Sequence, residues 1–136
     1  MATEFALSVV APDREVVSTM AISLVAPGVD GYFGVLAGHI PVVSALKPGI
    51  LEYLDPSNNR HHVYVGGGFV QVDGTSVTVL ADEARNASDL DVSEAEKALE
   101  AARKGLRGDE DATMTQAEAV VEIERATARL KAARNK

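Results

Sequence analysis

The sequence has 136 residues and a mass of 14.3 kDa, enough for one ordinary domain with an appendage and for burial of roughly two-thirds of the unfolded surface. A net charge of −7 disfavours general binding to nucleic acid or to anionic lipid, and the lack of cysteine excludes disulfides, thiolate metal sites and a catalytic thiol. Because no stretch approaches the roughly 20 apolar residues of a membrane span and the start shows no basic and apolar leader, we expect a soluble protein.

Apolar residues alternate with polar ones through much of the first 85 residues, which is the period of half-buried strands. Asp73-Gly74 has the chemistry of a tight hairpin turn, and residues 55–59 supply another loop. Short strands joined by such turns favour a small antiparallel sandwich or flattened barrel. The alternating sets are Phe5, Leu7 and Val9, then Met20, Ile22 and Leu24, then Val77, Val79 and Ala81.

The composition changes sharply near residues 84–92. All the tyrosines, phenylalanines and prolines come before this point, whereas the rest of the chain is rich in Ala, Glu, Lys and Arg. The sequence therefore predicts a β-sandwich domain over residues 1–87 followed by an α-helical hairpin over residues 88–136.

The helical part has two amphipathic segments with a spacing of three and four residues. Ser93 with Glu96, and Thr115 with Glu118, match the capping box, so we expect helices to begin near residues 93 and 115. The glycines and acids of residues 105–111 form the loop between the helices. The expected contact faces are Val92, Ala95, Leu99, Ala102 and Leu106 on the first helix, and Val120, Ile123, Thr127 and Leu130 on the second.

These contact faces are thin, so the hairpin needs support from the β domain or from another protein, and its detachment should cost little. We expect it to act as a mobile arm. Acidic residues open the second helix and basic residues close it, which fits a solvated helix with favourable ends as well as a basic tip for an acidic partner.

The residues that could carry catalysis or metal binding form no convincing constellation. Adjacent His61 and His62 point to opposite faces of a strand, and His39 has no evident partner for a catalytic triad. Residues 66–68 are three glycines without the Lys-Ser/Thr of a phosphate-binding loop, so a bulge or close backbone packing is the better interpretation. We expect neither an enzyme nor a metal protein.

Two runs carry a family likeness: GYFGVLAGHIPVV at residues 31–43 and LKPGIL at residues 46–51. They resemble the epsilon subunit of F-type ATP synthases, whose N-terminal part bears Gly-x-x-Gly-Val-Leu-x-x-His-x-Pro followed by Leu-Lys-Pro-Gly. VGGGFVQV at residues 65–72 and VTVLAD at residues 77–82 are similar to the next two strands of that family, and the tail is similar to its helical hairpin. The likeness spans nearly the whole chain.

The resemblance implies a ten-stranded β sandwich in the central stalk, bound to the gamma subunit and resting on the ring of c subunits. The chain would be a peripheral protein at the cytoplasmic face of an energy-coupling membrane, which is expected to be a bacterial inner membrane. By the same resemblance Asp30, Gly31, His39 and Pro41 would lie on the rotor and c-ring side. Gly31 and Pro41 fit simple turn-shaping roles at least as well, and His39 fits a structural hydrogen bond.

In this family the C-terminal helices lie folded or rise along gamma toward the beta and alpha subunits, where basic residues hinder ATP hydrolysis. The matching basic residues are Arg125, Arg129, Lys131 and Arg134. Some members bind ATP through Ile/Leu-Asp-x-x-Arg-Ala, and here Asp91 is retained while Glu94 replaces the arginine. We therefore expect no cofactor and weak or absent ATP binding, and Asp91 also fits a plain helix-start role.

Two other classes of function stay open on the residues alone. A small β-sandwich ligand-binding module would need exposed aromatic residues, but aromatics make up only 4% of the chain. A hydrolytic or metal-dependent enzyme lacks a constellation of catalytic groups. Binding to a gamma subunit would separate the stalk protein from both.

Overall fold

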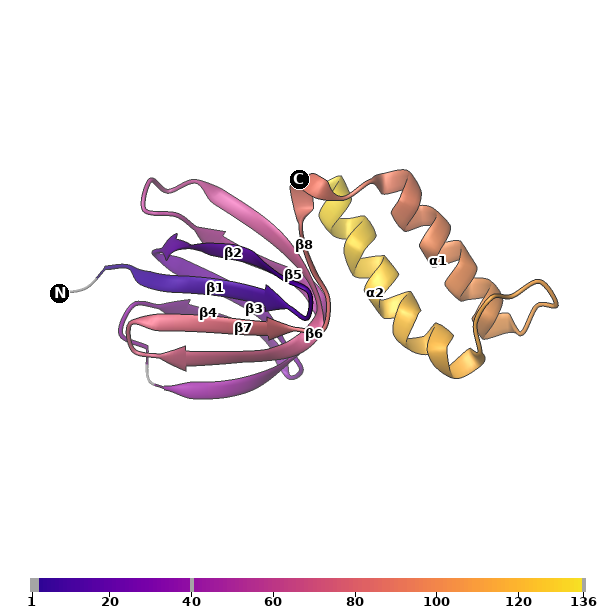
Figure 1. The fold of residues 1–136 in the computed structure, drawn as a ribbon, viewed down its shortest axis with the longest axis horizontal. Helices are drawn as coiled ribbons and strands as arrows, with labels where there is room; N and C mark the ends of the chain where they lie inside the picture. The colour runs from indigo at the N-terminus through magenta and orange to yellow at the C-terminus, as the bar shows by residue number, and fades with distance from the viewer. Residues whose placement is uncertain (1–2, 40, 136) are drawn as a thin grey trace. The chain divides into compact units, whose positions relative to one another are not determined.

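The computed structural model describes residues 3–39 and 41–135. Backbone contacts divide the chain into two compact units, Met1–Asn86 and Ala87–Lys136. The first is built of strands and the second of helices (Figure 1). The expected fold class, a β sandwich followed by an α-helical hairpin, is confirmed.

Within the described part of the first unit, the chain forms eight strands in one continuous sheet of order β2-β1-β7-β6-β5-β3-β4, with β8 paired to β6. All pairs are antiparallel except β1 with β7, which is parallel, so the expected purely antiparallel arrangement is wrong at this one place. The strands are β1 (Phe5–Ala11), β2 (Arg14–Ala21), β3 (Ser23–Gly28), β4 (Gly31–Leu36), β5 (Val42–Leu54), β6 (Arg60–Asp73), β7 (Ser76–Ala81) and β8 (Ala84–Asn86).

The sheet folds over on itself because its two longest strands, β5 and β6, each pair with strands of both layers. Residues 68–73 of β6 pair with β7, whereas residues 63–65 pair with β8. Likewise the first residues of β5 pair with the part of β6 next to β7, and its last residues pair with β3. The described residues thus form eight strands where the family likeness implies ten, and the two long strands β5 and β6 each pair with different partners along their length.

The core of the first unit follows the expected alternation in β1 and β7. Phe5, Leu7 and Val9 are buried, as are Val77, Val79 and Ala81. The set at residues 20–24 is wrong because the chain turns there: β2 ends at Ala21 and β3 begins at Ser23, which leaves Met20 39% exposed. One strand was expected where two meet.

The helical unit contains a short 3-10 turn, η1 (Ala87–Asp89), and two helices, α1 (Val92–Arg107) and α2 (Gln116–Arg134). Thr115 caps α2 with the expected capping box. Its hydroxyl accepts from the Glu118 amide, and the Glu118 carboxylate accepts from the Thr115 amide. The expected box at Ser93 is wrong: Asp91 is the N-cap of α1. The loop is also shorter than expected, because Gly105 lies inside α1 and Gly108 caps its end.

The helices contact each other through alanine and larger aliphatic side chains. Ala95 and Leu99 of α1 meet Ala126 and Leu130 of α2, with Ile123 beside them. The expected face of α2 is right at Ile123 and Leu130. It is wrong at the other two positions, because Val120 is 60% exposed and Thr127 is exposed, while Ala119 and Ala126 are buried instead.

The expected face of α1 holds except at its end, where Leu106 is 45% exposed. Among residues 3–39 and 41–135, neither helix has the length and apolar character needed to cross a bilayer.

Candidate functional site

Large apolar side chains lie exposed on the outside of β5, β6 and β7. Phe69 and Leu80 are direct cross-strand neighbours, and Ala45 pairs with Phe69 from the other side. Val43 points to the same face two residues before Ala45. Val43 is 67% exposed, Phe69 56% and Leu80 52%. Exposed apolar residues gathered on neighbouring strands make this face a candidate interaction surface. We call these four residues, Val43, Ala45, Phe69 and Leu80, the outer apolar face.

Two turns border this face. The Val29 amide, next to Asp30, donates to the carbonyl of Ala45 at 3.1 Å. The Gly38 amide, next to His39, donates to the carbonyl of Gly74 in the β6–β7 turn at 3.0 Å. The six residues of β4 separate the two turns, a span of about 20 Å at the rise of a strand. The expected rotor-side residues therefore do not form one cluster.

The expected rotor-side residues lie in turns and loops, where the structure gives each a simple environment. Gly31 has φ 128°, a backbone conformation that favours glycine, so the turn-shaping interpretation fits it. Asp30 and Pro41 are exposed, and the His39 amide donates to the carbonyl of Leu36 at 3.1 Å. Ile40, at a variable position of the family motif, lies outside the described residues.

The two remaining histidines pair with carboxylates of their own hairpin. His61 Nε2 lies 2.9 Å from Asp55 Oδ2, and its ring stacks on Tyr53 with centroids 4.7 Å apart. His62 Nε2 lies 3.0 Å from Glu52 Oε1. The His61 hydrogen bond, with backbone amides of the Asp55–Asn59 turn, lowers the pKa of Asp55 to about 2.

The carboxylates therefore hold the ends of β5 and β6 together. Within the described ranges, no three His, Asp or Glu side chains converge in a way that could hold a metal ion.

The glycine run at residues 66–68 is a place of close backbone packing. A Cβ on Gly68 would lie 2.1 Å from the carbonyl oxygen of Leu80, and its φ is 135°. It sits where β6 passes from β8 to β7. This geometry fits the interpretation of the glycines as a place of close backbone packing and not as a phosphate-binding loop.

The four basic residues of α2 differ in environment. Arg129 donates to Glu122 on the same helix, and its side chain is 13% exposed. Arg134 reaches across to Glu96 of α1 at 3.4 Å. Lys131 is exposed and makes no ion pair with any residue that the structure describes. Arg125 is half-buried and lines a cavity. The four do not form one free basic strip.

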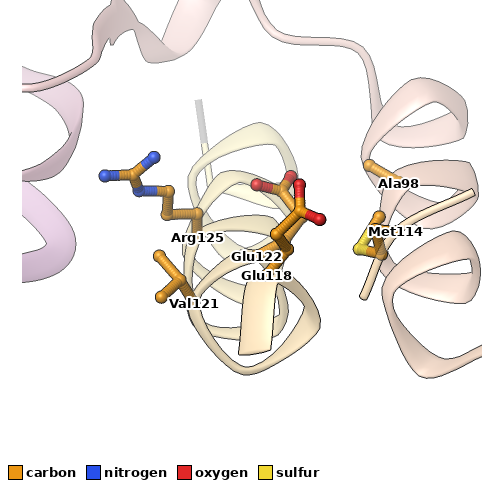
Figure 2. Close-up of a pocket in the computed structure, with 6 residues that line it drawn as sticks. All are labelled: Ala98, Met114, Glu118, Val121, Glu122 and Arg125. Atoms are coloured by element: carbon orange, nitrogen blue, oxygen red, sulfur yellow. The ribbon is translucent and has the colours of Figure 1, made fainter. Parts of the chain in front are cut away.

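That cavity, of about 430 Å³, lies along α2 (Figure 2). In the picture Glu118 and Glu122 extend from α2 in the same direction, while Arg125 extends away from Ala98 and Met114. Hydrogen bonds from Thr115 lower the pKa of Glu118, so it is held as an anion. Two carboxylates and one guanidinium make a poor receptor for a polyphosphate. The lining residues are Ala98, Met114, Glu118, Val121, Glu122 and Arg125.

The Asp91 side chain is already used as the N-cap of α1. Its Oδ1 accepts from the Glu94 amide at 3.1 Å, which confirms the helix-start interpretation. The exposed Glu94 side chain adds a negative charge in the first turn of the helix. The carboxylates of Asp91 and Glu94 would both repel an anion bound near this position.

The outer apolar face was missed in the sequence, although a signal for it exists. The run Val70-Gln71-Val72 comes directly before the Asp73-Gly74 turn, and if its two valines face the core, alternation turns Phe69 and Gln71 outward. A large aromatic at an outward position is the clue. Its neighbour Leu80 alternates with Val77 and Val79 in the same way.

Comparisons with known proteins agree over residues 4–134. The family model described as ATP synthase, Delta/Epsilon chain, beta-sandwich domain matches residues 4–87, and the model for the long alpha-helix domain of the same chain matches residues 88–134. An ATP synthase epsilon chain of Nitratidesulfovibrio vulgaris is 41% identical over 125 residues, covering 92% of each chain. One from Hyphomonas neptunium is 42% identical over 106 residues, covering 78% of each chain.

Solved structures give the same fold. A chain in the mitochondrial ATP synthase of Euglena gracilis, solved by cryo-EM as OSCP, F1 and c-ring, matches with a TM-score of 0.82 at 26% identity, covering 98% of this chain and 82% of that one. A chain in the central stalk and c-ring of the Tetrahymena thermophila enzyme matches with a TM-score of 0.58 at 12% identity, covering 95% of this chain and 96% of that one. The second likeness concerns the fold alone.

Proposed function

The chain belongs to the family of ATP synthase delta and epsilon chains, and from this premise we propose that it joins the gamma subunit to the c-ring and restrains ATP hydrolysis through its helices. It is an epsilon-type, non-catalytic accessory subunit of the synthase, as its relatives are. The sequence resemblance to this family is confirmed. Its bacterial relatives favour a place at the cytoplasmic face of a bacterial inner membrane.

The gamma subunit is the proposed partner of the outer apolar face. The supporting observation is the exposure of Val43, Phe69 and Leu80 on three adjacent strands, with polar Gln71 and Thr78 beside them. A stable partner would cover this apolar surface permanently, which suits a shaft subunit more than a transient ligand.

Asp30 with Gly31, and His39 with Pro41, are proposed as contacts at the two turns that border this face. Because β4 separates the turns, we assign them to different contacts, one on gamma and one on the c-ring. Their exposed residues suit a polar rim around the apolar centre.

The helical unit is proposed as the regulatory part. Lys131 is exposed and unpaired among the described residues, so it can meet an acidic segment of a beta or alpha subunit without first losing an ion pair. The bulk of the helix would do most of the blocking, because exposed ion pairs are worth under about 1 kcal/mol.

A binding measurement tests the gamma contact. Phe69→Ser and Leu80→Ser in the full chain should each weaken binding to a purified gamma subunit by about tenfold or more, as expected for a central interface residue. Val121→Ser on α2 removes an apolar residue of similar exposure outside this face and should leave the affinity unchanged. Unchanged affinity in both sheet variants would exclude this face as the gamma contact.

A further inference from the structure

The end of α1 and the loop that follows it carry charges of opposite sign in contact. Lys104 Nζ lies 2.9 Å from Asp111 Oδ2, and Arg107 Nη2 lies 3.0 Å from Asp109 Oδ2. Arg107 also reaches back to Glu100 at 3.5 Å. The loop acids thus fold back onto the two cations of the last turn of α1.

Backbone bonds hold the same residues. The amides of Gly108 and Asp109 both donate to the carbonyl of Lys104, at 3.0 and 3.1 Å, which is the capping pattern that closes a helix. The carbonyl of Lys104 and its side chain therefore both contact the loop.

The start of α2 is tied to the same place. Gln116 Nε2 donates to the carbonyl of Leu106 at 3.1 Å. Beside it, a Cβ on Gly105 would lie 2.5 Å from Met114 Cγ and 3.0 Å from the Ala119 side chain, so the helices approach closely here. Separation of α1 from α2 at this end must disturb the loop.

We propose that Lys104, Arg107, Asp109 and Asp111 form an electrostatic clasp that keeps the helical hairpin closed at its loop end. The clasp sets how readily α2 leaves α1. The hairpin is consequently harder to open at low ionic strength than at high, because exposed charge pairs are screened by salt. The regulatory meaning of the clasp rests on the proposed function, whereas its existence does not.

The chain offers matched controls for both signs of charge. Glu110 lies between the two clasp acids, and Arg103 lies beside Lys104; neither makes an ion pair with any residue in the described ranges. Asp111→Asn can therefore be compared with Glu110→Gln, and Lys104→Met with Arg103→Met. Each pair removes the same charge from the same region.

Amide hydrogen exchange of the full chain, followed by NMR, reads the clasp directly. In Asp111→Asn and in Lys104→Met the Gly108 and Asp109 amides should exchange about two- to fivefold faster, in line with one exposed ion pair. Glu110→Gln and Arg103→Met should leave them unchanged. The double variant Lys104→Met/Asp111→Asn should be no faster than either single variant, because both remove one interaction.

Salt provides an independent arm. Raising sodium chloride from about 50 to 500 mM should accelerate these amides in the unmodified chain, because the Debye length shrinks several-fold over this range. The acceleration should be smaller in the double variant, which keeps only the Arg107–Asp109 pair of the clasp. The clasp would be overturned if Glu110→Gln and Arg103→Met accelerated exchange of the Gly108 and Asp109 amides as much as the clasp variants do. It would also be overturned if exchange of these amides responded neither to charge removal nor to salt.

Hydrolysis by the assembled enzyme then tests its regulatory meaning. Asp109→Asn/Asp111→Asn should shift the degree of inhibition relative to Glu110→Gln. Faster exchange without any change in hydrolysis would preserve the clasp and contradict the proposed regulatory function instead.

Discussion

Arg129 and Glu122 form an ion pair along one side of α2, seven residues apart, with Arg129 Nη2 donating to Glu122 Oε1. Arg129 is one of four bases that the family likeness assigns to inhibition. Its side chain is only 13% exposed and already serves the helix itself. Charge in the sequence is therefore not equivalent to charge available for a partner.

This difference separates two basic residues experimentally. Lys131→Ala should weaken inhibition of ATP hydrolysis in the assembled enzyme while changing the free energy of unfolding by no more than about 0.5 kcal/mol. Arg129→Ala should destabilise the chain by about 1–2 kcal/mol, because it leaves Glu122 without its partner. Urea unfolding gives the stabilities. Equal destabilisation by both variants would contradict the assignment of Arg129 to a structural pair.

The glycine at the crossing of the two layers should be the least replaceable of its run. Gly68→Ala places a methyl group 2.1 Å from the Leu80 carbonyl oxygen in a backbone conformation of φ 135°. We expect a loss of at least about 2 kcal/mol in the free energy of unfolding. Gly34→Ala is the control, because its added carbon would sit at an ordinary 3.8 Å from the Leu24 carbonyl. Similar losses in the two variants would show that strand glycines matter only for their entropy.

Acid should weaken the β5–β6 hairpin through Asp55. The folded-state pKa of Asp55 is about 2, below its value in an unfolded chain, because His61 and the backbone amides of Ser57 and Asn59 stabilise the carboxylate. Its contribution to stability is therefore present above about pH 4 and is lost as the pH falls toward 2.

Asp55→Asn should flatten the dependence of unfolding free energy on pH between about 4 and 2. Asp13→Asn, at the exposed β1–β2 turn, is the control and should keep the slope. The measurement is urea unfolding at a series of pH values. An unchanged slope in the Asp55 variant would mean that the His61 pair does not hold this carboxylate in solution.

The strands of the sandwich were predictable because burial of one face imposes its period on the residues. Phe5, Leu7 and Val9 alternate strictly and are buried. The break at Ala21 was not predictable, because alternation looks the same when one strand ends and another begins.

The helices show why hydrophobicity alone mistakes a contact face. Valine is more apolar than alanine, so Val120 was expected inside, but the close approach of α1 at Gly105 admits only small residues such as Ala119. The cap of α1 was ambiguous for another reason: Asp91 and Ser93 can both accept from an amide three residues on.

The candidate site was the hardest part to predict. A partner surface is apolar where the sequence would otherwise be polar. Alternation places Phe69 and Leu80 outward, but only the register of β5–β7 shows that they lie side by side. The basic residues of α2 were visible, but their ion pairs depend on which residues the helix brings together.

ATP binding is the remaining expectation, and the charges around α1 argue against it. Asp91 is engaged with the Glu94 amide, and the Glu94 side chain adds a negative charge where the ATP-binding motif implied by the family resemblance has arginine. Isothermal titration of the full chain should show no binding at ATP concentrations up to about 1 mM, a limit that corresponds to about −4 kcal/mol. Glu94→Arg should raise the affinity by replacing repulsion with a phosphate-pairing group, whereas Glu110→Arg, the same change in the loop, should not. Micromolar ATP binding by the unmodified chain would mean that other residues, beyond this motif, hold the nucleotide.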